Sequence, residues 1–143
     1  MVQQWIDVDE DADVLEMVVG VDERLRAMCV FDVLANNTDR KGGHILPTTD
    51  GHVYGVDHGI CFAAEPKLRT ILWGWRGQEL TIDELAVVRR VCDDLDANLG
   101  TALSDLISSA EVRATSQRTE SLLRTGRFPQ PDPTRPALPW PPF

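Results

Sequence analysis

Residues 38–59 read TDRKGGHILPTTDGHVYGVDHG, and the fold expected for the chain depends on this stretch. Within it, two short apolar segments, 44–47 and 52–56, lie on either side of Thr48-Thr49-Asp50-Gly51. An Asp-Gly pair between two such segments is typical of a β-hairpin, because its tight turn needs the positive φ that glycine adopts readily. A hairpin this small cannot form a core, so we expect it to position the residues that flank it.

Residues suited to phosphoryl transfer lie at both ends of this hairpin. Asp39 precedes it, His44 stands at its start and Asp57 follows it. Phosphoryl transfer needs one carboxylate to orient or deprotonate the attacking hydroxyl, and further ligands to hold the Mg²⁺ that bridges the nucleotide phosphates. Mg²⁺ takes few protein carboxylates, since phosphate and water complete its shell. A hairpin can bring Asp39 and Asp57 to one metal.

Upstream of the hairpin, the sequence predicts two helices. An acidic stretch at 9–13 precedes the apolar run 14–19, which predicts a helix that ends at Gly20. A second helix should begin near Asp22, and its run is apolar nearly all round, which is typical of a buried helix. Asp32 lies inside this run and needs a partner such as an arginine or backbone amides. The helix should end at Asn36-Asn37.

Downstream, residues 58–80 are irregular and three further helices are expected. The sequences 81–84 (TIDE) and 108–111 (SSAE) match capping boxes. An apolar stripe between them, from Leu85 to Leu106, has helical spacing, and Gly100 should divide it into two helices. The last helix should stop at Gly126. The proline-rich tail is expected to be disordered, or else strapped across the body by three aromatic residues, Phe128, Trp140 and Phe143.

Composition and charge restrict the function further. The chain has 143 residues, 43% hydrophobic and 26% charged, which fits one globular domain. Its net charge of −9 argues against nucleic-acid binding and against docking on anionic membranes, while still permitting a local basic patch. No apolar run reaches the roughly 18 residues of a membrane span, and the N-terminus lacks the basic start of a signal peptide. We expect a cytoplasmic protein with reduced cysteines.

The motifs around the hairpin resemble those of a known family. Phosphatidylinositol 3- and 4-kinases carry a catalytic loop of the form GDRHxxNIL followed by HIDFG, and this chain reads TDRKGGHIL and then GVDHG. It looks most like small actinobacterial proteins of the phosphatidylinositol 3-/4-kinase-like type, which share its WIDVD, NNTDRKGGH, KLRTILWGW and WPPF segments. The resemblance implies a catalytic role for Asp39 and metal-binding roles for Asp57 and His44. It also implies Mg²⁺ or Mn²⁺ and ATP as cofactors.

Three positions depart from the family pattern. His44 stands where the family has a metal-binding Asn, Lys41 replaces a His, and His58 replaces the Phe of DFG. An imidazole is a softer ligand than an amide oxygen and suits Mn²⁺ or Zn²⁺ better than Mg²⁺. We expect Lys41 to contact nucleotide phosphate and His58 to support the loop.

Four further residues are candidates for weaker roles. Lys67 and Arg69 lie where the family has its activation loop, so they either bind a phosphate or are solvated cations. The resemblance places Trp5 near a hinge, where it either lines an adenine pocket or, as we favour, packs in the core. Asn37 ends a helix and is a candidate to hydrogen-bond the catalytic loop.

The expected fold is therefore mainly α with a small β-hairpin, a protein-kinase-like C-terminal lobe that lacks its N-terminal lobe. The chain has two lysines, both after Asp39, and no GxGxxG, so neither phosphate-binding part of such a lobe is present. A fragment or a misassigned start is favoured over a natural half-kinase. The expected parts are a C-lobe (1–128), with a catalytic loop (38–44), hairpin (44–57), metal-binding motif (55–59), activation-type loop (60–80) and helices (81–125), and a tail (129–143).

The leading functional hypothesis is ATP-dependent phosphotransfer to an unidentified hydroxyl on a lipid, a protein or a small molecule. One alternative is a non-catalytic pseudokinase module that binds a metal or a nucleotide. Another is nucleotidyl transfer, which would use the same two aspartates. Three histidines, His44, His52 and His58, also leave a structural zinc site conceivable.

Overall fold

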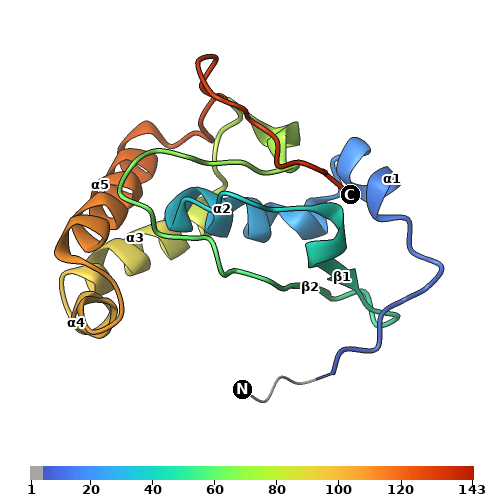
Figure 1. The fold of residues 1–143 in the computed structure, drawn as a ribbon, viewed down its shortest axis with the longest axis horizontal. Helices are drawn as coiled ribbons and strands as arrows, with labels where there is room; N and C mark the ends of the chain where they lie inside the picture. Colours follow the sequence, from blue (N-terminus) through green and yellow to red (C-terminus); the bar gives the residue numbers. More distant parts are fainter. Residues whose placement is uncertain (1–4) are drawn as a thin grey trace.

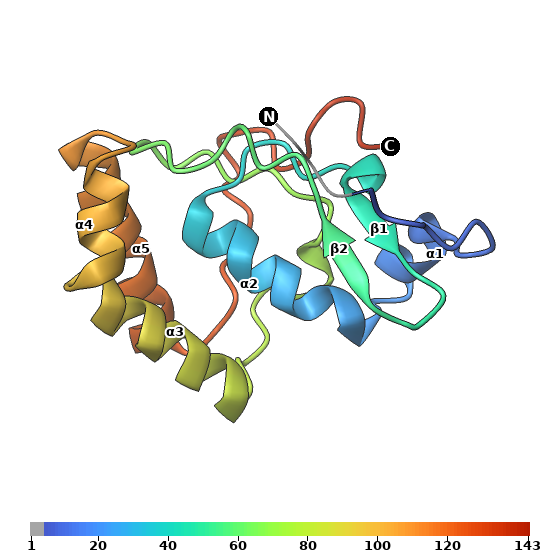
Figure 2. The ribbon, with the colours of Figure 1, turned by 90° about the horizontal axis from the view of Figure 1, so that it is seen from below.

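The computed structural model describes residues 5–143, and its elements surround one long irregular segment. Figures 1 and 2 show the three C-terminal helices together at one end, the hairpin and α1 at the other, and α2 running between them. The helices are α1 (Val14–Val19), α2 (Arg26–Ala35), α3 (Ile82–Leu95), α4 (Asn98–Ser104) and α5 (Ser109–Thr125), and the strands are β1 (Ile45–Pro47) and β2 (Val53–Gly55). Single 3₁₀ turns occur at Glu23–Leu25, Gly42–His44 and Trp73–Trp75.

Most of the predicted helix ends are confirmed, but α2 begins at Arg26, after the 3₁₀ turn Glu23–Leu25, and not near Asp22. Asp13 caps α1 by accepting the Glu16 N–H, and Gly20 follows its last turn. Both capping boxes form, with reciprocal hydrogen bonds at the starts of α3 and α5. Gly126 ends α5 with a φ of 61°. These helix ends could be predicted from the sequence, because each capping residue satisfies backbone groups that lie within a few residues of it.

The hairpin is also confirmed. β1 and β2 pair antiparallel with Ile45 opposite Gly55 and Pro47 opposite Val53. Gly51 has a φ of 87° in the connecting turn, a conformation that glycine tolerates without strain. In the described part of the chain this is the whole sheet, so the body is mostly helical, consistent with a kinase-like C-terminal lobe.

The core lies where α2 meets the irregular segment and the C-terminal helices. Leu25, Leu72, Trp75 and Val88 are each at most 2% exposed. Arg26 joins α2 to α3 through two hydrogen bonds to Glu84, the shorter 2.6 Å. The other buried members of the core are Met17, Cys29, Val30, Ile45, Ile71, Leu80, Leu122 and Phe128. Burial of these apolar side chains thus holds α2 against the irregular segment and the C-terminal helices.

The role predicted for Gly100 is wrong. The chain breaks between α3 and α4 at 96–97, and Gly100 lies inside α4. A Cβ at Gly100 would stand 1.9 Å from the Leu95 carbonyl oxygen. This glycine is therefore needed for close backbone approach and not for helix termination.

The tail is strapped across the body and not disordered. Phe128 is 3% exposed and belongs to the core. The Pro142 carbonyl accepts the Gly42 N–H at 2.8 Å, and the Phe143 ring occupies the space that a Gly42 Cβ would need. Trp140 is 88% exposed, so its predicted part in the strap is wrong. Figure 1 shows the tail running over the upper side of the molecule toward α1.

Residues 1–4 lie outside the described residues, and residues 5–8 have no regular secondary structure. The prediction that Trp5 packs in the core is wrong, because its side chain is 84% exposed and donates a hydrogen bond to Asp7. Among the described residues, no helix combines the length and apolar character needed to cross a membrane.

Candidate active site

The candidate catalytic loop, residues 38–44, begins at the C-terminal end of α2. Asn36 adopts the left-handed conformation there, with a φ of 52°, and turns the chain out of the helix. Its side-chain amide donates to the Ala63 and Glu65 carbonyls and accepts the Lys67 N–H. The sequence signal Asn-Asn therefore ends the helix and also fastens the irregular segment beside the loop.

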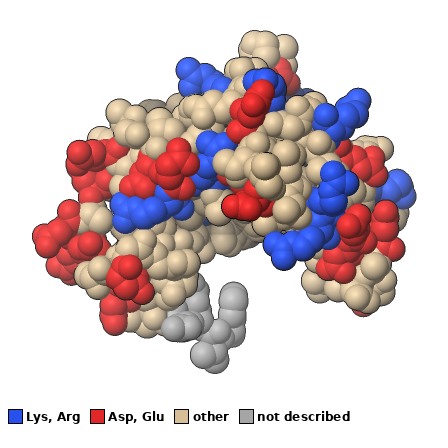
Figure 3. All heavy atoms as spheres, turned by 180° about the vertical axis from the view of Figure 1, so that it is seen from behind, with Lys and Arg blue, Asp and Glu red and all other residues tan. Residues whose placement is uncertain are grey.

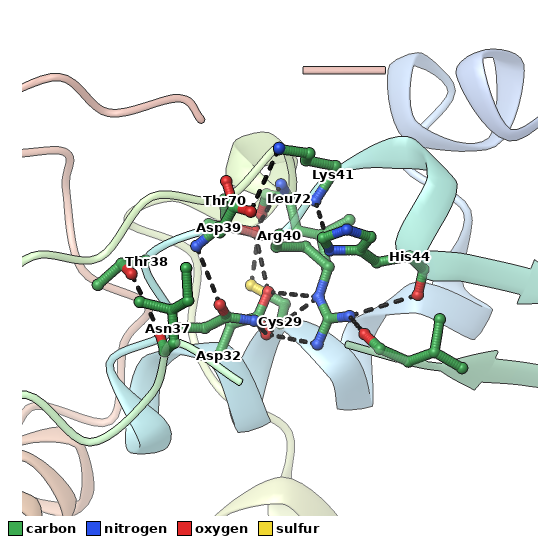
Figure 4. Close-up of polar contacts among 12 residues, drawn as sticks. Cys29, Asp32, Asn37, Thr38, Asp39, Arg40, Lys41, His44, Thr70 and Leu72 are labelled. Carbon is green, nitrogen blue, oxygen red and sulfur yellow. Dashed lines mark hydrogen bonds and ion pairs between the residues drawn. The ribbon is translucent and has the colours of Figure 1, made fainter. Parts of the chain in front are cut away.

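A buried ion pair supports the loop from below. Arg40 and Asp32 are both 0% exposed, and the Arg40 Nη2 lies 2.9 Å from Asp32 Oδ1. Of the partners expected for Asp32, an arginine or backbone amides, the structure supplies an arginine. Asn37 and Thr70 each donate a further hydrogen bond of 2.9 Å to the same carboxylate (Figure 4). A buried carboxylate with this many donors is well satisfied.

Arg40 also connects the two halves of the candidate site. Its Nη1 donates to the carbonyls of His44, at 3.4 Å, and of Val56, at 3.2 Å. One planar guanidinium thus binds α2, the start of β1 and the residue that precedes Asp57. Fixed backbone at these points determines where His44 and Asp57 can place their side chains.

Asp39 is held at the surface of the loop. Its backbone N–H donates to the Asn37 side-chain oxygen at 3.0 Å, which gives Asn37 a contact with the catalytic loop. Its carboxylate lies 3.3 Å from the Lys41 ammonium, and both side chains are about one-quarter exposed. A partly exposed carboxylate with an adjacent cation can orient a hydroxyl while the cation faces an incoming phosphate.

His44 and Asp57 come together across the hairpin. The His44 Nε2 lies 3.5 Å from Asp57 Oδ2, with His44 14% and Asp57 67% exposed. Asp57 has a φ of 53°, a left-handed conformation in which aspartate is enriched among non-glycine residues. The hairpin thus brings together the two residues to which the family resemblance assigns metal binding.

The donor set fits Mg²⁺ or Mn²⁺ as a partial site. No group of three His, Cys, Asp or Glu in residues 5–143 could hold a metal, which also contradicts the zinc alternative. An exposed carboxylate beside an imidazole suits a cation whose other ligands are phosphate oxygens and water. The His44 Nδ1 accepts the Lys41 N–H at 3.5 Å, and its Nε2 faces the Asp57 carboxylate.

His58 lies against α2. Its ring meets Phe31 edge-on, with 4.8 Å between centroids. Burial, followed by the charge of Arg40, lowers the pKa of His58 below its ordinary value. His58 is therefore mostly neutral at pH 7, with its exposed ring resting against Phe31.

The candidates outside the loop are not all brought to it. Lys67 pairs with Glu65 at 3.0 Å. The Arg69 backbone accepts the Arg40 N–H at 3.1 Å and donates to Asn37, so this segment runs beside the loop. The Arg69 side chain lines a separate cavity. Trp5, exposed as described above, lines neither described cavity.

Sequence reasoning missed Arg40 and Thr70. In the Asp39-Arg40 dipeptide, the sequence pattern draws attention to the aspartate, yet the arginine makes more hydrogen bonds. The sequence did contain a signal for Arg40. It follows the loop residue Asp39 and stands eight residues after Asp32, an acid inside an apolar helix. Thr70 carried none, because its partner Asp32 lies far away in the sequence.

A mostly helical body with a small hairpin beside the two aspartates is consistent with the C-terminal lobe of a kinase-like protein. The family model described as phosphatidylinositol 3- and 4-kinase matches residues 22–80, which include the loop, the hairpin and the irregular segment. The predicted resemblance to phosphatidylinositol 3-/4-kinase-like proteins is thereby confirmed for this segment.

The chain is also similar to Protein Rv2133c of Mycobacterium tuberculosis. The two are 48% identical over 135 residues, which cover 94% of this chain and 48% of that relative. This chain thus spans about half the length of the relative, and the actinobacterial context is as expected. No solved structure matches.

Proposed function

We propose that this chain forms the C-terminal-lobe part of an ATP-dependent phosphotransferase of the phosphatidylinositol 3-/4-kinase-like type. The observation that carries the proposal is the approach of His44 to Asp57, at 3.5 Å, next to a loop that presents Asp39. This supports a metal-nucleotide site in which protein ligands are few. The acceptor is a hydroxyl, and the net charge of −9 weighs against one on an anionic lipid surface.

In this proposal each residue has a separate task. Asp39 orients the acceptor hydroxyl and receives its proton, while Lys41 balances charge on the phosphate that moves. Asp57 and His44 hold Mg²⁺ or Mn²⁺, which would neutralise the nucleotide phosphates when bound. Arg40 is a positioning residue, because it touches only Asp32 and backbone carbonyls.

The binding half of the proposal is tested by titrating ATP with Mg²⁺ or Mn²⁺ into the wild type and Asp57→Ala by calorimetry. We expect wild-type binding, weakened at least about tenfold by the loss of one metal carboxylate. Asp94→Ala, an exposed acid on α3, is the matched control and should bind like the wild type. Absent binding, or binding unchanged in Asp57→Ala, overturns the site.

The transfer half is tested with Asp39→Asn. We expect nucleotide affinity to stay the same, while ATP turnover falls by about 10²–10⁴-fold, the usual contribution of a positioned base. Turnover equal to that of the wild type would remove Asp39 from the mechanism.

A second candidate is a nucleotide-binding module without transfer. The observation that favours it is the Lys41–Asp39 pair, which engages the proposed base with a cation. Both lysines of the chain are then in ion pairs, since Lys67 pairs with Glu65. Metal-dependent ATP binding that Asp57→Ala abolishes, together with no turnover in the wild type, would select this candidate.

A further inference from the structure

A large cavity lies apart from the candidate active site. Its volume is about 670 Å³, within the range of about 300–1,000 Å³ typical of small-molecule sites. Its walls are α5, the segment 66–69 and the first part of the tail. Asp39, His44 and Asp57 do not line it.

The lining of this cavity is apolar with an excess of cations. Leu122 and Phe128, 4% and 3% exposed, provide apolar wall together with Leu68 and Trp73. Five cationic side chains and a single acid, Asp132, line the cavity. In a chain with a net charge of −9 this excess is local, and Figure 3 shows Lys and Arg side chains standing among acidic ones on one face. The cations are Lys67, Arg69, Arg118, Arg127 and Arg135.

Three of these cations are already neutralised by carboxylates. Lys67 and Arg135 both pair with Glu65, Arg135 also lies 3.7 Å from Asp132, and Arg127 pairs with Glu79. Arg69 and Arg118 have no carboxylate partner among residues 5–143. The unbalanced positive charge of the cavity therefore resides on these two guanidinium groups.

Arg118 is the more constrained of the two. It donates to the carbonyls of Leu34 and Ala63 and to the Thr115 hydroxyl, at 2.8–3.2 Å. These three bonds leave two of the five guanidinium N–H donors free. Burial lowers the pKa of Arg118, as expected for a cation removed from water without a counter-ion. An anion in the cavity would supply the missing charge through a two-pronged contact.

We infer that this cavity binds a small amphipathic anion, a carboxylate or phosphate on an apolar body, with Arg69 and Arg118 holding the anionic group and Trp73, Leu122 and Phe128 holding the body. The site is separate from the proposed phosphotransfer site. It does not depend on metal or nucleotide.

The experiment is calorimetric titration of the full chain with decanoate, decyl phosphate, decanol and inorganic phosphate, below micelle-forming concentrations. We expect the two amphipathic anions to bind at least about tenfold more tightly than decanol or inorganic phosphate, which each lack one of the two features. The comparison of decanoate with decyl phosphate identifies the preferred head group. Equal affinity for decanol and decanoate, or for inorganic phosphate and decyl phosphate, overturns the inference, as does no binding.

Variants locate the site. Arg69→Met and Arg118→Met should each weaken decanoate binding about tenfold or more, whereas Arg113→Met, an exposed arginine on α5 outside the cavity, should not. Arg118 also holds backbone carbonyls, so Arg69→Met, whose side chain makes no hydrogen bond in the described part of the chain, is the decisive variant. Unchanged affinity in Arg69→Met contradicts the site. Asp57→Ala should bind decanoate normally even if ATP binding is lost, which separates this inference from the proposed function.

Discussion

At the scale of single residues, the candidate site depends on a side chain that performs no chemistry. Arg40 is fully buried and makes hydrogen bonds to Asp32 and to the carbonyls of His44 and Val56. Of the two proposed metal ligands, Asp57 is 67% exposed and His44 is 14% exposed. The Arg40 guanidinium therefore stabilises the fold and also positions the site, so replacing it should affect both.

Arg40→Met tests this dependence. It leaves the Asp32 carboxylate buried without its cation, so we expect the free energy of unfolding to fall by about 3–5 kcal/mol, measured by urea denaturation. Arg24→Met is the control, because the Arg24–Asp22 pair is exposed and should contribute less than about 1 kcal/mol. Similar losses in the two variants would show that the buried network does not stabilise the loop.

His58 gives the site a dependence on pH. Because burial lowers the pKa of folded His58, the unfolded chain takes up a proton first as the pH falls through about 6.5. The free energy of unfolding should therefore decrease from about pH 6.5 down to the lower folded-state pKa, and this contribution is fully present above pH 6.5. Urea midpoints at pH 7.5 and 5.5 should differ more for the wild type than for His58→Phe, which keeps the contact with Phe31. Equal differences would contradict a lowered pKa of His58 in the folded chain.

At the scale of elements, the sequence predicted what is local and missed what is not. Caps, the hairpin and Asn36 could be predicted because their partners lie within a few residues. The metal-binding roles of His44 and Asp57 rest on the family resemblance. The hydrogen bond from Thr70 to Asp32 and the α3–α4 junction could not be predicted, because they depend on segments brought together only by tertiary packing. Gly100 shows this, since the same residue type suits a helix end and a tight backbone contact.

Gly100→Ala tests the reassignment of that glycine. The added methyl would overlap the Leu95 carbonyl, a backbone group that cannot move without shifting α3 against α4. We expect a loss of about 1–3 kcal/mol in the free energy of unfolding, the usual cost of overpacking, seen as a lower Tm. Gly43→Ala is the matched control, because its Cβ would meet no atom within 4 Å. If the two variants have the same Tm, the backbone around Gly100 can move to accommodate the methyl group, and the reassignment is wrong.

At the scale of the whole molecule, the tail joins regions distant in sequence. It forms part of the cavity wall through residues 128–130, 132 and 135–137, and it covers the loop at Gly42. Between these points the Ala137 carbonyl accepts the Thr70 N–H at 3.2 Å and the Trp73 indole N–H at 3.0 Å. Removing the tail should therefore loosen the loop and the irregular segment together.

Deletion of residues 137–143 tests this role by hydrogen-exchange mass spectrometry. The Gly42 and Thr70 amides lose the Pro142 and Ala137 carbonyls, so peptides that contain them should exchange up to about tenfold faster. Peptides from α3 serve as the reference and should be unchanged, since the Leu85 amide donates to Thr81 within its own helix. Faster exchange throughout the protein would indicate general unfolding, and no change would show that the tail does not protect the loop.

The contact between Gly42 and the Phe143 ring has a consequence for biosynthesis. A ribosome delivers the chain from its N-terminus, so the loop at 38–44 leaves the exit tunnel well before the residues that cover it. During that interval Gly42 and its neighbours are open to solvent, to chaperones and to any early nucleotide. A released chain that ends before residue 137 would thus present the uncovered form of the loop on an otherwise complete set of helices.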